Sequence, residues 1–411
     1  MEVSKDKSML PSWGMLMLIS CGAAFGCYFA SNMRLPVVPL YARSLGINTA
    51  QIGFINSAFF LMAAFLSLPL GFVSDRLGRK PLASLGLLVI SGASFLLYFS
   101  DTFIQIMSCY LFMGLGYAAF GPTMMSFVAD ISPATHLGRS YGWYTTAIYC
   151  GMSLGPAAGG FVAQASGFLP VFLISGVLMF LIFWIVIFFL PRTQSVLKPR
   201  SKKKKSATLV RQLFKNRPLM GCWVITLGGC FGLGMFITFI PLHAKNNGLN
   251  ISQIGLVFFV QGLVNALSRI PLGYLSDKVV DRKILVVLGM IGFAAAMAGF
   301  GISRTVGHFV VCAITLGTSM GLAFTSVGAL IAETVDPESR GVAMGGYNTC
   351  IYIGMMLSST LMGTVILMIG FEYAFSLTAG LNLLLIGVFY FFMKGFTPAG
   401  TDRSDKSIEL E

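Results

Sequence analysis

Long apolar segments separated by short polar ones dominate the pattern of this chain. A helix that crosses the hydrocarbon of a bilayer needs about 20 mostly apolar residues. Twelve stretches meet this requirement, near residues 13–33, 51–73, 82–100, 104–129, 140–164, 169–190, 219–241, 252–275, 283–301, 308–332, 342–368 and 373–394. We therefore expect an all-α membrane protein with twelve transmembrane helices and both chain ends on one side.

One part of this pattern occurs twice. Residues 46–76 return 202 positions later as residues 248–278, and twelve of the thirty-one positions are identical. Two membrane-embedded halves related in this way are typical of transporters that expose a central site to each side in turn. The sequence thus predicts two pseudo-symmetric six-helix bundles. We assign residues 13–191 and 218–394 to the bundles, 192–217 to a linker, and 1–12 and 395–411 to terminal segments.

Composition and charge agree with a membrane protein and predict its orientation. Of the residues, 56% are apolar and only 10% are charged, so lipid is the main solvent of the chain. The side that holds both ends carries 23 of the 28 Lys and Arg, the other side carries Arg34, Arg43, Lys245 and Arg304, and Arg269 is embedded. By the positive-inside rule, both termini are expected in the cytoplasm, with the protein in the cell (inner) membrane.

The linker over residues 192–217 is strongly basic and includes Lys202–Lys205. We interpret it as a signal for orientation, with contact to anionic lipid headgroups as the alternative. A nucleic-acid partner is not expected, because the chain has no folded domain outside the predicted bundles.

A charged motif follows the second predicted helix and recurs in the second half. It contains Gly71, Asp75, Arg76, Gly78 and Arg79, and its counterpart contains Gly273, Asp277 and Arg282. The order of these residues resembles the signature between helices two and three of the major facilitator superfamily. Glycine allows a close helix approach, and each carboxylate lies at a helix end.

Further carboxylates end helices four and ten, at Asp130 and Glu333. The resemblance implies one charge cluster of Asp75, Arg79 and Asp130, and another of Asp277, Arg282 and Glu333. Such clusters act as latches that gate transport.

Helix five carries glycines at separations of four and nine residues. The motif comprises Gly142, Gly151, Gly155, Pro156, Gly159 and Gly160. These glycines leave a helix face without side chains, so that another helix can approach closely, and the proline removes a backbone hydrogen bond. The string resembles a motif shared by drug/proton antiporters of the superfamily and generally absent from its symporters. The resemblance implies efflux; the alternative is a packing face without bearing on direction.

Candidate substrate contacts are the polar and aromatic residues of the predicted spans. Arg269 lies eight residues before Asp277, which corresponds to roughly 12 Å along a helix. An embedded cation suggests function, although its side chain can also reach toward the membrane surface. If Arg34 and Arg269 both face a cavity, an anionic, zwitterionic or neutral amphipathic substrate is favoured over a lipophilic cation. The other candidates are Tyr28, Asn32, Tyr110, Tyr117, Tyr144, Tyr149, Phe236, Gln261, Asn265, Tyr347, Asn348 and Tyr352.

The chain departs from the antiporter pattern in one respect. Antiporters of this group usually carry an arginine in helix four with a role ascribed in proton coupling, and Tyr110 stands at that position. We also find no acidic residue near the middle of a predicted span.

Several classes of function are not supported by the sequence. The three histidines are far apart, no phosphate-binding GxxxxGK[ST] string occurs, and the eight cysteines fall within predicted spans. We therefore expect neither an enzyme nor an ATP-driven pump, and no cofactor or metal.

The resemblance favours a monomeric secondary transporter that exports small amphipathic molecules, with the proton as coupling ion. The alternatives are an uptake or facilitated carrier of a small organic anion, and a non-transporting receptor, which the short loops disfavour.

Overall fold

The computed structural model describes residues 12–191, 213–279, 281–336 and 339–396. Most of the predicted basic linker, including Lys202–Lys205, and most of the tail lie outside these ranges. The first half contains α1 (Trp13–Asn32), α2 (Val37–Ser44), α3 (Thr49–Leu77), α4 (Arg79–Tyr98), α5 (Phe103–Ile131), the 3-10 turn η1 (Ala134–His136), α6 (Leu137–Ser166) and α7 (Phe168–Phe189). The second half contains α9 (Arg217–Asn246), α10 (Ile251–Lys278), α11 (Arg282–Ile302), α12 (Val306–Thr334) and α13 (Arg340–Met393).

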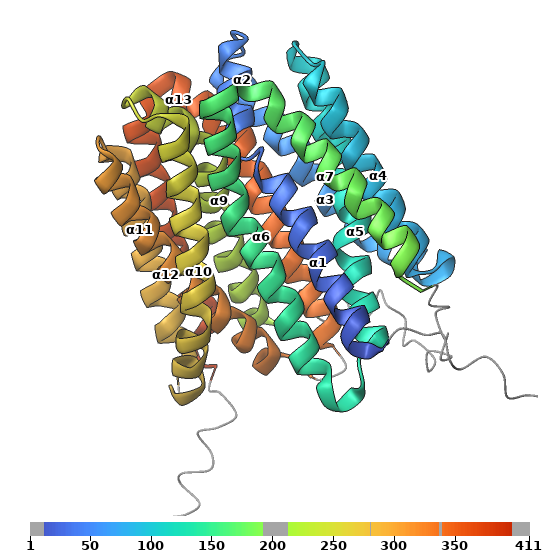
Figure 1. Ribbon diagram of the computed structural model, residues 1–411. Helices are drawn as coiled ribbons and strands as arrows, with labels where there is room; N and C mark the ends of the chain where they lie inside the picture. The colour runs from blue at the N-terminus through green and yellow to red at the C-terminus, as the bar shows by residue number, and fades with distance from the viewer. Residues whose placement is uncertain (1–11, 192–212, 280, 337–338, 397–411) are drawn as a thin grey trace, which may run out of the picture.

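The two halves repeat the same helix packing and lie side by side (Figure 1). In the first half α3 and α4 both pack on α5, and α1 packs on α6; in the second half α10 and α11 both pack on α12, and α9 packs on α13. The halves contact each other mainly through α3 with α13 and α6 with α10. This arrangement confirms the predicted all-α membrane fold of two pseudo-symmetric bundles.

Twelve crossings follow from the helices once two details are considered. Ten helical stretches in the described residues are long and apolar enough to cross a membrane, with α1 and α2 counted together as Trp13–Ser44. The 54-residue α13 is among them, but its backbone turns at Gly370, where φ is 82°, so it provides two crossings. The glycine-rich α6 is not among the ten, yet at 30 residues it is long enough to span.

The duplicated sequence gives both halves the same helix start. Asn48 and Asn250 cap α3 and α10, and each exchanges hydrogen bonds with the glutamine three residues later, Gln51 or Gln253. This reciprocal cap satisfies backbone N–H groups that a helix leaves without a partner. The repeat of asparagine and glutamine thus fixes where the second and eighth crossings begin.

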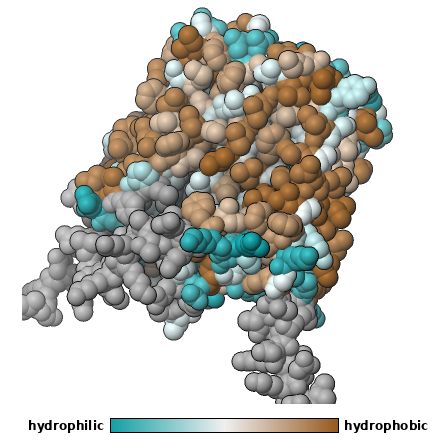
Figure 2. All heavy atoms as spheres, turned by 180° about the vertical axis from the view of Figure 1, so that it is seen from behind, coloured by the Kyte–Doolittle hydropathy of each residue, from teal (hydrophilic) through white to brown (hydrophobic). Residues whose placement is uncertain are grey.

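The outer surface is apolar over a broad band between two hydrophilic ends (Figure 2). Large side chains such as Leu18 and Phe188 are at least 70% exposed. Exposure on this scale is expected where lipid replaces water around a helix. The chain is therefore an integral, multi-pass membrane protein.

The first crossing differs from the prediction. The helix predicted over residues 13–33 ends at Asn32, and after a turn at residues 33–36 the chain resumes as α2. Pro36 and Pro39 explain the interruption, because proline provides no N–H for a continuous helix. Arg34 lies in this turn and is only 3% exposed, so its assignment to a loop on one side of the membrane was wrong. Arg217, assigned to the linker, is the first residue of α9.

Candidate functional site

The first charge cluster joins the ends of α3, α4 and α5. Arg79 places Nη1 2.5 Å from Asp75 Oδ1 and Nε 3.1 Å from Asp130 Oδ2, and it also donates to Ser74 Oγ. Gly78, with φ of 92°, separates α3 from α4 and lets the chain turn so that the arginine faces back. The resemblance implied these contacts, and the structure brings the three residues together.

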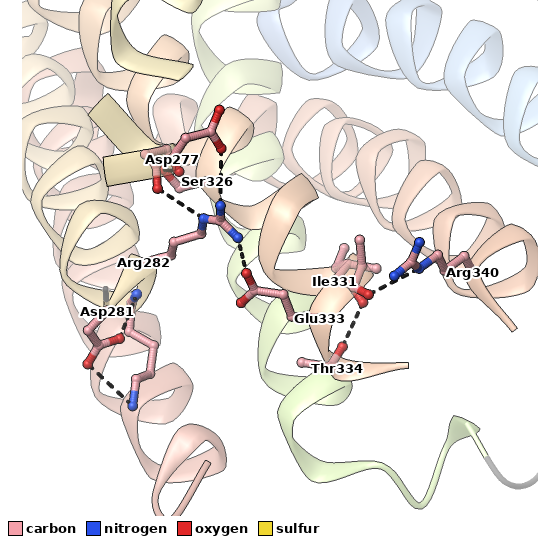
Figure 3. Close-up of polar contacts among 11 residues, drawn as sticks. Asp277, Asp281, Arg282, Ser326, Ile331, Glu333, Thr334 and Arg340 are labelled. Atoms are coloured by element: carbon pink, nitrogen blue, oxygen red, sulfur yellow. Dashed lines mark hydrogen bonds and ion pairs between the residues drawn. The ribbon is translucent and has the colours of Figure 1, made fainter. Parts of the chain in front are cut away.

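The second cluster repeats this arrangement in α10, α11 and α12 (Figure 3). Arg282 lies between two carboxylates: its Nη2 is 3.1 Å from Asp277 Oδ1, and its Nη1 pairs with Glu333. Its Nε also donates to the backbone oxygen of Ser276. We call the end of the molecule that holds both clusters the cluster end, and the opposite end, where α2 lies, the α2 end.

The glycines of the charged motif make no close helix contact in this conformation. A Cβ added to Gly71 would meet nothing within 4 Å, and one on Gly273 would meet only Thr325 Cγ2 at 3.6 Å. Gly142 of helix five is also open. The expected close approach at these positions is therefore absent in this conformation. Arg76 is exposed beside the first cluster.

The glycines in the second part of α6 make the predicted close contacts, and they do so on two sides. A Cβ on Gly151 or Gly155 would lie 2.6 or 2.5 Å from backbone oxygens of α1. Gly159 likewise lies against the backbone of Met33. On the other side, a Cβ on Gly160 would lie 2.7 Å from the backbone oxygen of Ile251 in α10. Thus α6 packs on α1 and also across the interface between the halves.

The halves meet at the α2 end. There, a Cβ on Gly255 would lie 2.6 Å from Pro156 O, and one on Gly363 would lie 2.7 Å from Ala50 Cα. The two hydrogen bonds that the described residues make between the halves are also here, including Ile251 N to Gln164 Oε1 at 3.1 Å. The described chain is therefore closed at the α2 end.

Deeper in the interface, three helices contribute polar and aromatic groups around Arg269. The guanidinium of Arg269 in α10 lies over the ring of Tyr149 in α6, 4.5 Å from its centre. Its Nε donates to Asn265 Oδ1 at 3.3 Å. Tyr347 of α13 lies within electrostatic range of both Arg269 and Tyr149. Arg269 thus faces the opposite half and not the lipid headgroups.

A second aromatic group lies on the first half. Tyr28 meets Tyr117 edge to face at 5.7 Å between ring centres, and Tyr117 also meets Phe59 at 5.3 Å. Tyr352 of the second half lies within electrostatic range of Tyr28 and Tyr117. The Asn32 amide is held by a hydrogen bond to Tyr28 O. The sequence candidates that remain partly exposed are Tyr28, Asn32, Tyr117, Tyr149, Arg269, Tyr347, Asn348 and Tyr352.

The other candidates are buried in helix packing. They are Arg34, Tyr110, Tyr144, Phe236, Gln261 and Asn265. Phe236 packs between Phe258 and Phe300, and Gln261 Nε2 contacts Met320 Sδ at 3.2 Å. Asn265 also accepts a hydrogen bond from Arg269 Nε, and the others are enclosed by helix packing in this conformation.

Arg34 differs most from the sequence expectation. Its Nη1 donates to Ser94 Oγ at 2.6 Å and contacts Met113 Sδ at 3.0 Å, so it points between α4 and α5 inside the first half. Neither partner was predicted from the sequence. Ser94 and Met113 lie 60 and 79 residues from Arg34 along the chain, so no local pattern indicates these contacts. Of these two arginines, Arg34 is therefore enclosed within the first half, and Arg269 lies where the two halves meet.

Comparisons with known proteins identify the family. The model of the Major Facilitator Superfamily matches residues 20–252 and 230–409. An uncharacterized transporter of this type from Methanocaldococcus jannaschii is 25% identical over 84% of this chain and 91% of its own length. Multidrug resistance protein MdtG from Salmonella schwarzengrund is 27% identical over 87% of this chain and 91% of its own length.

Solved structures agree on the fold. The nucleoside transporter NupG superposes with a TM-score of 0.77 at 17% identity, covering 93% of this chain and 100% of its own. A bacterial homologue of the human lysosomal transporter Spinster, in an inward-facing and unoccupied conformation, gives 0.75 at 15% identity, covering 93% of this chain and 96% of its own. With the family model matching almost the whole chain and two pseudo-symmetric bundles in place, this protein belongs to the major facilitator superfamily of transporters.

Proposed function

We propose that this transporter exports small amphipathic molecules from the cytoplasm in exchange for an ion, with the proton as the coupling ion. The observation that carries the proposal is the glycine and proline motif of α6. Gly151 and Gly155 pack on α1 of the same half, and Gly160 packs on α10 of the other half, at the interface that must open and close during transport. The relationship to the multidrug resistance protein MdtG supports the same direction.

In this function the cluster end faces the cytoplasm, as the positive-inside rule favours. The conformation described here is then closed to the outside, and the space around Arg269 and Tyr149 is reached from the cytoplasm. A substrate would enter at the cluster end, after which the halves would rock so that contacts at the α2 end break. The two charge clusters would hold α3–α5 and α10–α12 as rigid units during this movement.

Transport into everted membrane vesicles tests direction and coupling together. Vesicles with an acidic interior present the cytoplasmic side to the medium, so an exporter should accumulate a fluorescent naphthyl amphiphile and release protons as it does so. A pH-sensitive dye inside the vesicles would report the proton flux. Accumulation that needs an alkaline interior, or that occurs only in intact cells, would overturn the proposed direction.

A carrier that takes up a small organic anion is the second candidate. The specific observation that favours it is Arg269, a cation at the interface without a carboxylate partner among the described residues. The same vesicles distinguish the two, because with an acidic interior an exporter accumulates its substrate inside them, whereas an uptake carrier moves its substrate toward the medium.

A further inference from the structure

Arg269 is an embedded cation whose electrostatic partner is missing from the described chain. The cations of both clusters are each paired with two carboxylates, whereas Arg269 forms no ion pair with any described residue. Ionisable residues at this depth are costly, and in most membrane proteins they pair with one another or face a polar cavity. Arg34 is also unpaired, but it is enclosed within the first half. Of these two arginines, Arg269 is the one that lies where a molecule between the halves could contact it.

The contacts of Arg269 fix its orientation and leave donors available. The ring of Tyr149 covers the guanidinium, and Asn265 Oδ1 accepts from Nε. The other four N–H donors of the side chain make no hydrogen bond to the described residues. A guanidinium held at its face and at Nε still presents its remaining edge, and that edge matches the two oxygens of a carboxylate or phosphate. Because the ring and the amide hold it beforehand, little freedom is lost on binding.

We propose that Arg269 binds the anionic group of an amphipathic substrate, a carboxylate or phosphate-type group whose apolar body lies against Tyr149 and Tyr347. The substrate of the transporter would thus be an amphipathic anion. This inference rests on the proposed function only in that the bound molecule is also transported. An amphipathic cation would meet Arg269 without any nearby carboxylate to offset the repulsion. The anion can come from a soluble molecule or from the headgroup of an anionic lipid, and the chemistry of recognition is the same.

Three probes with one aromatic body separate charge from hydrophobic contact. They are 1-naphthylacetate, 1-naphthylacetamide and 2-(1-naphthyl)ethylammonium, measured by fluorescence titration of the full chain in phosphatidylcholine nanodiscs. A hydrogen bond to a charged group contributes more to binding than one between neutral groups. We therefore expect the anion to bind wild type about tenfold or more tightly than the neutral amide, with the cation weakest.

Substitutions at one position then test the role of the guanidinium. In Arg269→Gln the preference for the anion over the amide should vanish, while affinity for the amide stays within about threefold, since the apolar contacts remain. Arg269→Lys should keep part of the preference, because it supplies charge without the two-pronged edge. If Arg269→Gln does not fold, the order of the probes in wild type and in Arg269→Lys still decides.

Arg304→Gln is the matched control. It removes one positive charge from the same half, but at the α2 end, where Arg304 pairs with Glu372 outside the interface. The anion preference should survive in this variant. A tighter affinity of wild type for the ammonium probe than for naphthylacetate, or an undiminished anion preference in Arg269→Gln, would overturn the proposal. Either result leaves the direction of transport untouched, so failure here is distinguishable from failure of the export proposal.

Nanodiscs that contain phosphatidylglycerol identify the source of the anion. If a lipid headgroup occupies the site, naphthylacetate should bind wild type several-fold more weakly in these discs, and Arg269→Gln should show no such difference. Equal affinities in both kinds of disc support a soluble substrate. Both results support recognition of an anion by Arg269.

Discussion

Arg34 and Arg269 both lie within the helical bundles and form no ion pair with the described residues, but their surroundings are opposite. Arg34 is 3% exposed and held by a serine hydroxyl and a methionine sulfur, whereas Arg269 is partly exposed and lies over a tyrosine of the other half. The two arginines therefore have different roles. The surroundings of Arg34 fix it within one half, and those of Arg269 leave its donors open to a ligand.

Arg34→Met tests this difference. No carboxylate is left unpaired by the change, and Ser94 Oγ keeps its hydrogen bond to Ile90 O. Burying a charged side chain costs free energy, and an apolar side chain of similar length avoids that cost. We expect a thermal transition no lower than that of wild type and an unchanged preference for naphthylacetate. A lost preference would place Arg34 in the binding site after all.

Asp75→Asn tests the first charge cluster. The change removes one of two carboxylates from Arg79 while Asp130 still holds it, so α3 loses its charged tie to α4 and α5. Because Asp75 is 40% exposed, we expect little effect on membrane insertion or folding. Transport should fall clearly, because α3 would no longer move as one unit with α4 and α5. Asp101→Asn, an exposed carboxylate at the α2 end, is the control and should transport normally. Normal transport by Asp75→Asn would remove Asp75 from the gating mechanism.

At the scale of the helices, the sequence predicts what depends on local pattern. Span lengths, the asparagine caps of α3 and α10 and the bare face of α6 follow from residues close together in the chain. The direction of Arg34 does not, because the turn at residues 33–36 changes the helical phase between α1 and α2. The contact of Arg269 with Tyr149 could not be predicted either, since it joins residues 120 positions apart through the docking of two halves.

The glycines of α10 allow a matched pair of substitutions. In Gly255→Ala the new methyl group would lie 2.6 Å from the backbone oxygen of Pro156, whereas in Gly273→Ala its nearest neighbour is a side-chain methyl at 3.6 Å. Backbone cannot move aside without shifting α6, so Gly255→Ala should disfavour closure at the α2 end. Gly273→Ala should behave like wild type in this respect.

A cysteine at Ser252, whose hydroxyl bonds Gly160 O across the interface, reports this closure. In a background without native cysteines, a membrane-impermeant maleimide added outside should label Ser252→Cys faster when Gly255→Ala is also present. Equal labelling rates with Gly255→Ala and Gly273→Ala would show that this glycine contact does not control the closed end.

For the molecule as a whole, alternating exposure requires that the contacts at the α2 end be temporary. Gln164 of α6 and Ile251 of α10 contact each other there, from opposite halves. A short bifunctional methanethiosulfonate should join Gln164→Cys to Ile251→Cys in this conformation. The tether would add no bulk near Arg269, so naphthylacetate should still bind from the cluster end, because one access route stays open. Transport should stop, since the halves can no longer part at the α2 end, and a reductant should restore it. Gln164→Cys alone, treated in the same way, should transport throughout. Continued transport by the tethered protein would mean that substrate leaves by a path other than the interface of α6 and α10.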